Sequence, residues 1–417
     1  MYFTRHLTNR LTELIEDFRI VYLTGPRQAG KSTIAKKIAA ENGMGYYTLD
    51  DAALLASAQN DPQGLIASLP KPLVLDEFQQ APELINAIKM ASDSAEGEKG
   101  LFLLTGSSDI FRSAKVQESL PGHMARVELY PLSQMEMNQG GVNIIDRLIE
   151  GRFTPSNAQA LDRFTLGELL IKGGYPEVIS KSPRSRGVWF ASYVEGRLLK
   201  DFETMHQAKG DYHGKLSALV RFLAGMTGNL VKYANIANDL GQDDKTVKRY
   251  MEILELMFII RRLDPYVRNA ARRAVVGMPK LHCIDTGLAC HLLGLKKAAT
   301  LHTSNFFGGL VENFVFTELL KHAAWADEEA VRFYHFRART KHEIDLVIER
   351  GDGQTLGIEV KASMSVKMED FSGLSVFADY AGERFLHGVL FYSGDKLLPF
   401  NIKGRTFHAV PISLFLH

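Results

Sequence analysis

This sequence of 417 residues has little cysteine and no long apolar segment, and each shortage excludes a class of protein. Its two cysteines, Cys283 and Cys290, are too few for a disulfide-stapled secreted fold or for a zinc site with four cysteine ligands. Because Cys290 lies in an apolar run, we predict buried free thiols in a reducing compartment. The longest apolar run of note, residues 253–260, is much shorter than the roughly 18 residues of a membrane-spanning helix.

A strong excess of charge of either sign is also absent, since 49 Lys and Arg stand against 48 Asp and Glu. The net charge of +1 excludes a histone-like polycation, although it leaves room for a local basic patch. The shares of hydrophobic residues, 46%, and charged residues, 23%, are typical of a globular protein. The N-terminal segment contains acidic residues and lacks the apolar core of a signal peptide. We therefore predict a cytoplasmic protein without membrane contacts, with about two to four domains at roughly 150 residues each.

Short apolar runs alternate with helical segments over residues 20–131, a pattern typical of crossover units and a parallel sheet. Two short helices at 233–241 and 243–257 precede a strand, and this order is winged-helix-like. From residue 308, a long helix is followed by strands. The predicted fold class is α/β with four regions: a parallel-sheet core at 1–135, a helical lid or linker at 136–208, a winged-helix-like domain at 209–280 and a second α/β domain at 281–417.

Residues 25–32, GPRQAGKS, match the pattern G-x-x-x-x-G-K-[ST] between a strand and a helix. Glycines in such a loop let backbone N–H groups approach phosphates at a helix N-terminus. Lys31 would reach the β- and γ-phosphates, and Ser32 would ligate Mg²⁺. Because the guanine-reading signature Asn-Lys-x-Asp is absent, the predicted nucleotide is ATP. The predicted nucleotide-binding residues of this segment are Gly25, Pro26, Arg27, Gln28, Ala29, Gly30, Lys31, Ser32 and Thr33.

Two further strands end in polar residues that suit ATP hydrolysis. Residues 73–77, LVLDE, end in Asp76, which we expect in the Mg²⁺ shell, and Glu77, which we expect to polarise the attacking water. A later strand ends in Thr-Gly-Ser-Ser, where Ser107, or Thr105 as the alternative, would sense the γ-phosphate. These residues together with the loop predict an ATPase site.

Two alternating strands flank a Gly-Asp-Gly turn at Asp352, which predicts a β-hairpin. Symmetry about residue 352 would place Asp345 opposite Glu359, and Glu343 opposite Lys361, on one face. Facing carboxylates favour a divalent cation, and a lysine beside them can activate water for attack on a phosphodiester. This pattern predicts a nuclease site that takes Mg²⁺ or Mn²⁺, with solvent-facing charges, or binding without cleavage, as the alternatives. The predicted metal ligands are Glu312, on the preceding helix, Asp345 and Glu359.

Basic residues on the second helix of the pair, 243–257, could contact nucleic-acid phosphates. They are Lys245, Lys248 and Arg249, and acidic residues on the same helix dilute their charge. The alternative is therefore a helix pair that contacts a protein or another domain. A basic stretch follows and favours DNA as the partner. It consists of Arg261, Arg262, Arg268, Arg272, Arg273 and Lys280.

With these motifs in view, the sequence resembles bacterial and archaeal ATP-binding proteins of the AAA type that carry a C-terminal domain of unknown function 4143. GPRQAGKS and LVLDEFQQAP resemble the nucleotide motifs of that family, and SLPGHMARVELYPLS, GGYPEV and GGLVENFVFTELLK resemble its later blocks. HEIDLVIE and GIEVKAS resemble the strand pair of restriction-endonuclease-like PD-(D/E)XK domains. The resemblance covers nearly the whole chain. It implies an AAA-type ATPase module, a helical and winged-helix middle, a nuclease-like end, and a homo-oligomer in which one subunit completes the next subunit's site.

The cation that stabilises the developing charge of ATP hydrolysis is expected from Arg112 or Arg126, although either could be a solvated surface arginine. The sequence departs from the family near this point, because many relatives have arginine after SLPG where this chain has His123. A neutral histidine supplies no fixed cation, so Arg126 would take that role. For the C-terminal site, the resemblance implies that Lys361 activates water.

Three functions remain open from the sequence. The leading hypothesis is an ATP-driven enzyme that acts on nucleic acid and whose C-terminal site cuts or grips DNA. The second is an ATP-dependent switch or interaction protein that recognises DNA or a protein partner without cleavage. The third is a transcription regulator that binds DNA through the helix pair, and the complete set of acids and lysine argues against it.

Overall fold

The computed structural model describes residues 2–95, 97–108, 124–153, 158–206, 213–269, 277–328, 330–338 and 342–416. The described chain forms two compact units. The first comprises Met1–Leu132 with Leu256–Phe258, and the second comprises Ser133–Glu255 with Ile259–His417. The finer division into four regions stays a prediction.

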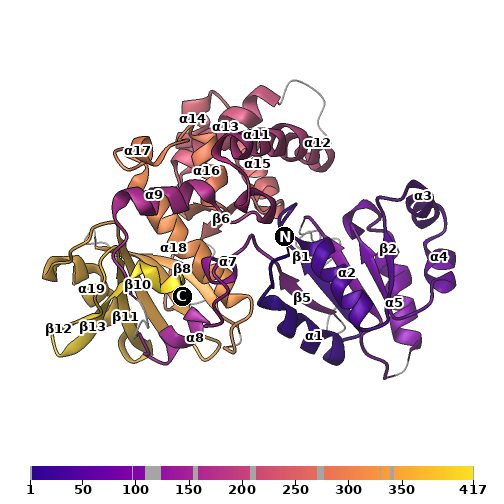
Figure 1. The fold of residues 1–417 in the computed structure, drawn as a ribbon, viewed down its shortest axis with the longest axis horizontal. Coiled ribbons are helices and arrows are strands. Elements are labelled where there is room, and N and C mark those ends of the chain that lie inside the picture. Colours follow the sequence, from indigo (N-terminus) through magenta and orange to yellow (C-terminus); the bar gives the residue numbers. More distant parts are fainter. Residues whose placement is uncertain are drawn as a thin grey trace. The chain divides into compact units, whose positions relative to one another are not determined.

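The first unit is built on a five-stranded parallel sheet with the strand order β2-β3-β4-β1-β5 (Figure 1). β1, β3 and β4 are buried along their whole length, as their continuous apolar runs predicted. β4 lies between β1 and β3, so the segments that follow these three strands meet at one edge of the sheet. The strands are β1 (Ile20–Thr24), β2 (Gly45–Thr48), β3 (Leu73–Asp76), β4 (Phe102–Gly106) and β5 (Met124–Glu128).

Helices cover this sheet and connect its strands. α1 buries Leu7, Leu11 and Ile15 on one face and packs on β1. α2 begins at Lys31, directly after the glycine-containing loop, and packs on β3 and β4. The helices of this unit are α1 (Leu7–Asp17), α2 (Lys31–Glu41), α3 (Ala52–Asn60), α4 (Pro62–Ser68) and α5 (Leu84–Ser94).

The second unit begins with helices, as the sequence predicted. The predicted helix pair is present as α14 and α15, separated by Gly241, which takes the left-handed conformation at φ 59° that favours glycine. The strand β6 (Ile260–Leu263) follows and pairs with β7 (Lys280–Cys283) in an antiparallel ladder. The described helices before the C-terminal sheet are α7 (Gln134–Met137), α8 (Ile144–Ile149), α9 (Arg163–Lys172), α10 (Pro176–Ile179), α11 (Pro183–Tyr193), α12 (Leu199–His206), α13 (His213–Gly225), α14 (Tyr233–Leu240), α15 (Asp244–Leu256), α16 (Thr286–Leu292), α17 (Ala298–Leu301) and α18 (Phe307–Ala323).

A six-stranded mixed sheet with the order β12-β13-β11-β10-β9-β8 forms the C-terminal part of the second unit. The β8–β9, β9–β10 and β12–β13 pairs are antiparallel, and the β10–β11 and β11–β13 pairs are parallel. α18 and α19 both pack on β10. The elements are β8 (Arg332–Arg337), β9 (Glu343–Glu349), β10 (Thr355–Lys361), α19 (Ser372–Ala381), β11 (Phe385–Tyr392), β12 (Leu398–Ile402) and β13 (Arg405–Pro411).

Helix α18 is buried on nearly all of its sides, which explains its apolar character around the whole helix. Its buried charged residues need partners, because an unpaired buried charge is costly. Glu318 accepts a hydrogen bond from Lys321 Nζ at 2.7 Å and one from the backbone N–H of Gln134 at 2.8 Å. Glu312, six residues earlier, has its partners outside the helix.

The expectations from the composition concern two features, the apolar helices and the cysteines. Among them, no helix is long and apolar enough to cross a membrane. Cys283 and Cys290 are both free and buried, which confirms the prediction from their apolar surroundings. Burial raises the pKa of the Cys283 thiol to about 11, so neither disulfide chemistry nor nucleophilic chemistry is suggested at this position.

Candidate functional site

The loop between β1 and α2 takes backbone conformations that require glycine at two positions. Gly25 has a φ of 147°, and a Cβ atom there would lie 2.1 Å from the carbonyl oxygen of Leu129. Gly30 caps the N-terminus of α2 with a φ of 102°. These conformations turn the chain from β1 into α2 within a few residues, which is the context that the motif needs to present N–H groups to phosphate. The other predicted residues of this segment, Pro26, Arg27, Gln28, Ala29 and Thr33, lie in the same loop and in the first turn of α2.

The ammonium group of Lys31 lies inside this loop. Its Nζ donates hydrogen bonds to the carbonyl oxygens of Gly25, at 2.9 Å, and Pro26, at 2.8 Å. Burial lowers the pKa of Lys31 to about 8, and the carboxylate of Glu77 opposes this shift. The positive charge that the motif needs for phosphate is therefore held within the loop itself, close to the acids that follow β3.

Asp76, the last residue of β3, is held by hydroxyl groups from three other elements. Ser32 Oγ donates to Asp76 Oδ1 at 3.1 Å, and Thr105 Oγ1 donates to the same oxygen. The hydroxyl of Tyr46, on β2, donates to Asp76 Oδ2 at 2.5 Å. The structure thus brings the predicted Mg²⁺ ligands Ser32 and Asp76 next to each other. Thr105, which the sequence offered as the alternative to Ser107, is the residue that contacts Asp76.

Glu77 follows Asp76 in a left-handed backbone conformation with a φ of 57°, which is strained for a residue other than glycine. Its carboxylate accepts a hydrogen bond from the side-chain amide of Gln79. The same amide nitrogen donates to Ser107 Oγ at 3.0 Å, and Gln79 Oε1 accepts from the backbone N–H of Ser107 at 3.2 Å. Gln79 therefore links the predicted water-activating residue to the predicted γ-phosphate sensor.

Arg5 is a residue of this site that sequence reasoning did not identify. Its guanidinium donates to the carbonyl oxygen of Ala29 at 2.7 Å and to that of Tyr130 at 2.6 Å, and the side chain is buried. Ala29 belongs to the phosphate-binding loop, so Arg5 fixes the loop backbone from the side of α1. A lone arginine ahead of an amphipathic helix carries no signal that distinguishes it from a surface residue.

We expect Arg5→Ala to weaken ATP binding by about tenfold or more, since each lost hydrogen bond to a charged donor is worth about 1.5–3 kcal/mol and the loop would lose its support. Titration with a fluorescent ATP analogue measures this effect. Arg10→Ala is the matched control, because Arg10 lies on α1 in an exposed pair with Glu13 at 3.2 Å. Equal ATP affinity in the two variants would show that Arg5 does not support the loop.

The predicted cation for hydrolysis has a partner within its own strand. Arg126, on β5, donates to the carboxylate of Glu128. To reach a nucleotide it would first have to leave this carboxylate. Arg112 and His123 lie outside the described residues.

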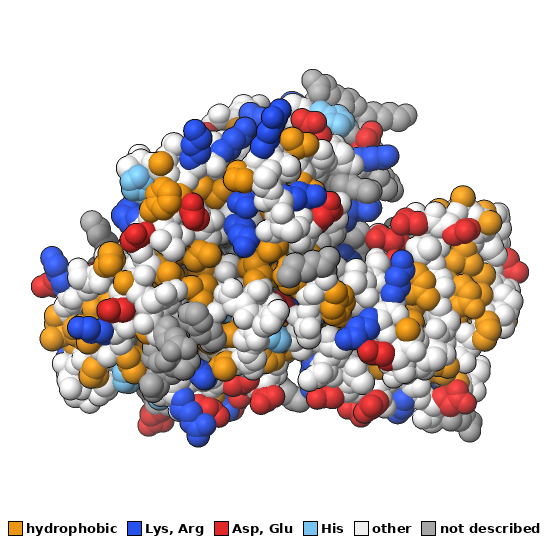
Figure 2. Space-filling view, in the orientation of Figure 1, with side chains coloured by type: hydrophobic (Ala, Val, Ile, Leu, Met, Phe, Trp, Pro, Cys, Tyr) orange, Lys and Arg blue, Asp and Glu red, His pale blue; other side chains and the backbone are white. Residues whose placement is uncertain are grey.

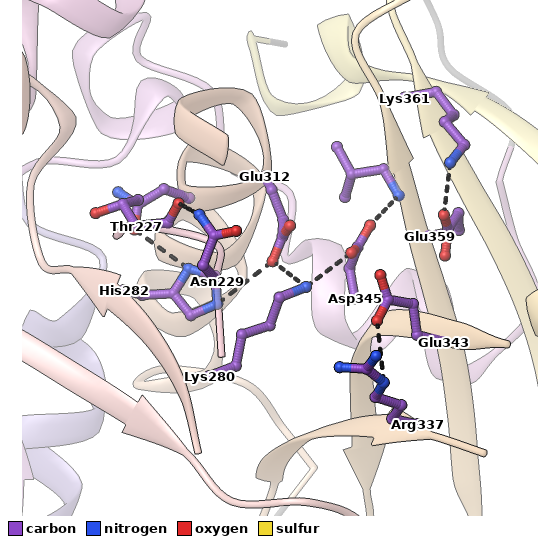
Figure 3. A network of polar contacts seen from close by, with 12 residues as sticks. Thr227, Asn229, Lys280, His282, Glu312, Arg337, Glu343, Asp345, Glu359 and Lys361 are labelled. Atoms are coloured by element: carbon purple, nitrogen blue, oxygen red, sulfur yellow. Dashed lines mark hydrogen bonds and ion pairs between the residues drawn. The ribbon is translucent and has the colours of Figure 1, made fainter. Parts of the chain in front are cut away.

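The C-terminal acidic residues lie around a lysine that the sequence analysis had assigned to a basic stretch (Figure 3). Lys280 Nζ, from β7, is 2.6 Å from Glu312 Oε1 and 2.8 Å from Asp345 Oδ1. Burial alone would lower the pKa of Lys280, but the carboxylates of Asp345 and Glu312 raise it above its usual value. Its ammonium group is therefore charged and bridges α18 and β9.

The hairpin has the predicted turn but not the predicted alternation of faces. Its pairs run from Thr355–Glu349 to Ile358–Leu346, which is the register symmetric about residue 352. On the other side of β9, however, the pairing with β8 shifts register between Ile344 and Val347. Both of these residues join the same hydrophobic cluster, although a regular strand would place positions three apart on opposite faces. The prediction of one acidic and one apolar face is wrong over this segment.

Of the predicted acids, Asp345 lies close to Glu359, whereas Glu343 does not share their burial. Asp345 Oδ2 accepts from the backbone N–H of Val360 at 2.9 Å, while its other oxygen binds Lys280. Glu343 is exposed, and its Oε2 atom lies 3.9 Å from Arg337 Nε (Figure 3). Among the described residues, no group of three or more His, Cys, Asp or Glu side chains is arranged to hold a metal ion.

Glu359 and Lys361 form a second pair beside Asp345. Lys361 Nζ donates to Glu359 Oε1 at 2.8 Å, and Glu359 Oε2 is buried with no hydrogen-bond partner among the residues that the structure describes. Burial and the negative charge of Asp345 raise the pKa of Glu359 to about 8. Burial would also raise the pKa of Asp345, but the Lys280 ammonium outweighs this effect and lowers it. The pKa of Asp345 is therefore lower than that of Glu359, so Asp345 ionises first of the two acids.

The helix pair presents basic side chains to solvent. Within α15, Val247 and Tyr250 are buried, whereas the basic residues of the same helix are exposed. Figure 2 shows Lys and Arg side chains gathered over the part of the second unit that contains α13 and α14. The exposed basic residues of α13 to α15 are Lys215, Arg221, Lys232, Lys245, Lys248 and Arg249.

Two members of the predicted basic stretch are used inside the fold instead. Arg262 donates from Nε and Nη2 to Glu255 Oε2, at 2.9 and 2.6 Å, and from Nη1 to the Tyr233 hydroxyl at 2.5 Å. It therefore ties β6 to α14 and α15. Lys280 is committed to the acidic residues described above. Arg272 and Arg273 lie outside the described residues, so the stretch does not form one continuous basic surface in the described part of the chain.

Comparison with known proteins divides the chain into three matched regions. Residues 17–138 match the family described as AAA domain, residues 163–299 match a domain of unknown function (DUF8612), and residues 307–415 match a domain of unknown function (DUF4143). Two similar sequences are the uncharacterized proteins Mb2031c of Mycobacterium bovis and Rv2008c of Mycobacterium tuberculosis. Each is 27% identical to this chain over 361 residues, which cover 86% of this chain and 73% of the relative.

Solved structures align with the chain at low identity. A Walker-type ATPase of Pyrococcus abyssi covers 70% of this chain and 96% of its own at 14% identity, with a TM-score of 0.42. The RuvB Holliday junction branch migration motor of Thermotoga maritima covers 61% of this chain and 88% of its own at 16% identity, with a TM-score of 0.30. Both TM-scores are below 0.5, so nothing about this chain's activity follows from them. The family matches alone show that the N-terminal region is similar to AAA domains and the C-terminal region to DUF4143 domains, as the sequence motifs predicted.

Proposed function

We propose that this protein binds and hydrolyses ATP in its first unit and acts on nucleic acid through its second unit. The observation that carries the proposal is the convergence of four side chains at one edge of the parallel sheet: Lys31, Ser32, Asp76 and Thr105. The loop, the acidic residue and the polar strand end come from separate parts of the sequence, and together they provide the kinds of group that phosphoryl transfer needs. The match of residues 17–138 to AAA domains supports the same activity.

Ser32 and Asp76 are the residues that would hold the Mg²⁺ ion that accompanies ATP. Their side-chain oxygens lie 3.1 Å apart, and hydroxyl and carboxylate oxygens are the hard ligands that Mg²⁺ prefers. When bound, Mg²⁺ neutralises charge on the β- and γ-phosphates. Tyr46 and Thr105 hold the Asp76 carboxylate in place for this role.

Glu77 would accept the proton of the attacking water, with Gln79 orienting its carboxylate. Ser107 stays the proposed γ-phosphate sensor, because the same Gln79 amide reaches its hydroxyl. Arg126 stays the proposed cation at the developing charge. The homo-oligomer that the sequence resemblance implied would allow a neighbouring subunit to supply a further cation, and it stays a prediction.

Nucleic acid is the proposed partner of the second unit because α15 buries one apolar face and exposes Lys245, Lys248 and Arg249, although Asp244 and Glu252 are exposed on the same helix. Neutralisation of phosphates by Lys and Arg dominates the affinity of such interfaces. The order of the helices α14 and α15 and the antiparallel pair of β6 and β7 supports this proposal, because it is the order expected of a winged helix. The alternative, in which the same surface contacts a protein, differs in its response to salt and to DNA.

We expect the double variant Lys245→Glu/Lys248→Glu to weaken DNA binding for every sequence alike, and to reduce the slope of log affinity against log salt by about one for each phosphate that is no longer neutralised. Fluorescence anisotropy with a labelled duplex at several salt concentrations measures both quantities. Lys296→Glu, an exposed lysine outside α15, is the control with the same change in charge for each residue. Unchanged affinity in the double variant would favour the protein-partner alternative.

Metal-dependent DNA cleavage by a restriction-endonuclease-like C-terminal domain is the second candidate function. One observation favours it: Asp345, Glu359 and Lys361, the predicted nuclease residues, come together at the same end of β9 and β10. The position of Lys280 opposes it and leads to the inference below.

A further inference from the structure

We infer that Lys280 is a built-in cation that takes the place of a divalent metal ion in the acidic cluster of Glu312, Asp345 and Glu359, and that the C-terminal domain therefore binds its partner without metal-dependent cleavage. The inference deepens the proposed function by narrowing the action of the second unit to recognition. It does not depend on ATP hydrolysis, which takes place in the first unit.

The first step is the geometry of the cation. Lys280 Nζ lies 2.6 Å from Glu312 Oε1 and 2.8 Å from Asp345 Oδ1, so one ammonium group bridges two carboxylates from different elements. The side chains of these three residues are between 9% and 14% exposed. A divalent ion that bridged these two acids through the same two oxygen atoms, at about 2.0–2.6 Å, would take the place of the ammonium group. The ammonium group occupies the position between them (Figure 3).

The second step is the number of oxygen atoms that remain. Asp345 Oδ2 is used by the backbone N–H of Val360, and Glu359 Oε1 is used by Lys361. A metal ion placed at the remaining oxygens would lie close to the ammonium groups of both Lys280 and Lys361, and like charges at this range repel in a buried site. The donor set therefore does not fit a divalent ion while Lys280 keeps its place.

The third step is the origin of Lys280. Lys280 belongs to β7 and pairs with Leu263 of β6. An isolated antiparallel β-bridge also joins its backbone to that of Leu230. The side chain thus comes from the small sheet that follows the helix pair and reaches the acids of α18 and of the six-stranded sheet. An ion pair of this kind joins the proposed DNA-recognition part of the second unit to the nuclease-like part, in the place where a nuclease would carry its metal.

Binding of Mn²⁺ to the full-length chain without nucleotide tests the inference, with free Mn²⁺ measured by electron paramagnetic resonance. All proteins carry Asp76→Asn, which removes the predicted ligand of the first unit. We expect the Asp76→Asn parent to show no Mn²⁺ site that depends on Asp345 or Glu359. Lys280→Ala in the parent should gain one site per chain, and further replacement of Asp345 by asparagine should remove it. Lys280→Arg, which keeps the charge, should behave like the parent.

Two results would overturn the inference. The first is a Mn²⁺ site in the parent that is lost on Asp345→Asn or Glu359→Gln, because it would show that the metal displaces the lysine. The second is a folded Lys280→Ala protein that gains no site, because the ammonium group would then not be what excludes the ion. If Lys280→Ala does not fold, Mn²⁺ binding by the parent and by its Glu359→Gln variant still tests the inference through the first of these results.

Plasmid cleavage with Mn²⁺ gives an independent readout on the chain with its natural residues. We expect the same background for this protein and for Lys361→Ala, and cleavage that disappears in Lys361→Ala would overturn the inference. ATP hydrolysis by the same preparation separates this outcome from a failure of the proposed ATPase, since an active ATPase without cleavage supports both proposals together.

Discussion

Glu77→Gln is expected to slow ATP turnover by about 100-fold or more while ATP still binds, because an amide cannot accept the proton of the attacking water. Glu77 follows β3 in a left-handed conformation and is oriented by the Gln79 amide. The variant keeps the size of the side chain and leaves Lys31, Ser32 and Asp76 in place. Single-turnover hydrolysis gives the rate of the chemical step, and titration with a fluorescent ATP analogue gives the affinity.

Gln79→Ala tests how much the rate depends on the orientation of the Glu77 carboxylate, because it removes the amide that donates to this carboxylate and leaves the carboxylate itself. We expect a smaller loss of rate than for Glu77→Gln, since the carboxylate remains but loses its partner. Gln80→Ala is the matched control, because the Gln80 amide contacts Asp50 at 2.7 Å instead. A turnover rate in Glu77→Gln equal to that of the unaltered protein would contradict the assignment of Glu77 as the base.

Lys280→Met is expected to lower the free energy of unfolding of the second unit by about 3–5 kcal/mol, because it leaves two buried carboxylates without their shared cation. Methionine keeps most of the length and apolar packing of the lysine side chain, so the loss reports on the charge. Urea unfolding followed by circular dichroism measures it. Lys245→Met, on the exposed face of α15, should change stability by no more than about 0.5 kcal/mol.

A double variant shows whether the Lys280 effect acts through the acids. Adding Glu312→Gln to Lys280→Met removes one of the two buried acids that have lost their cation, so we expect part of the lost stability to return. The two substitutions should therefore be non-additive, as substitutions of contacting residues are. Strict additivity would contradict the ion pair at 2.6 Å as the cause of the effect.

The parts of the ATPase site that could be predicted from the sequence are those whose conformation depends only on residues close together in the chain. The glycine conformations at Gly25 and Gly30 and the start of α2 at Lys31 depend only on the local chain, so the motif defines them. Asp76 was predictable as well, because a buried apolar strand that ends in an acid is unusual.

The supporting residues of that site could not be predicted, because their partners are distant in the sequence. Arg5 lies 24 positions from Ala29 and 125 from Tyr130, and Tyr46 lies 30 positions from Asp76. Their residue types are compatible with a surface or a core position. Only the packing of α1 and β2 against the neighbouring elements brings them to the loop and to the acid.

The C-terminal site depends even more on contacts between residues that are distant in the sequence. The Gly-Asp-Gly turn at Asp352 was sufficient to predict the hairpin register up to Leu346. Nothing in the residues around Ile344 indicates the register shift against β8, since neither glycine nor proline is present there. Lys280, 65 positions before Asp345, appeared in the sequence as one of several basic residues near a helix pair, and its role depends on tertiary structure alone.

ATP hydrolysis by the full-length protein, measured as phosphate release in the presence of Mg²⁺ with and without duplex DNA, tests the central claim most directly. We expect turnover by the unaltered chain, a higher rate with DNA, and no turnover by Lys31→Ala under either condition. Turnover without stimulation by DNA would favour a protein partner for the second unit. Equal phosphate release by the unaltered chain and by Lys31→Ala would show that the first unit does not hydrolyse ATP at this loop.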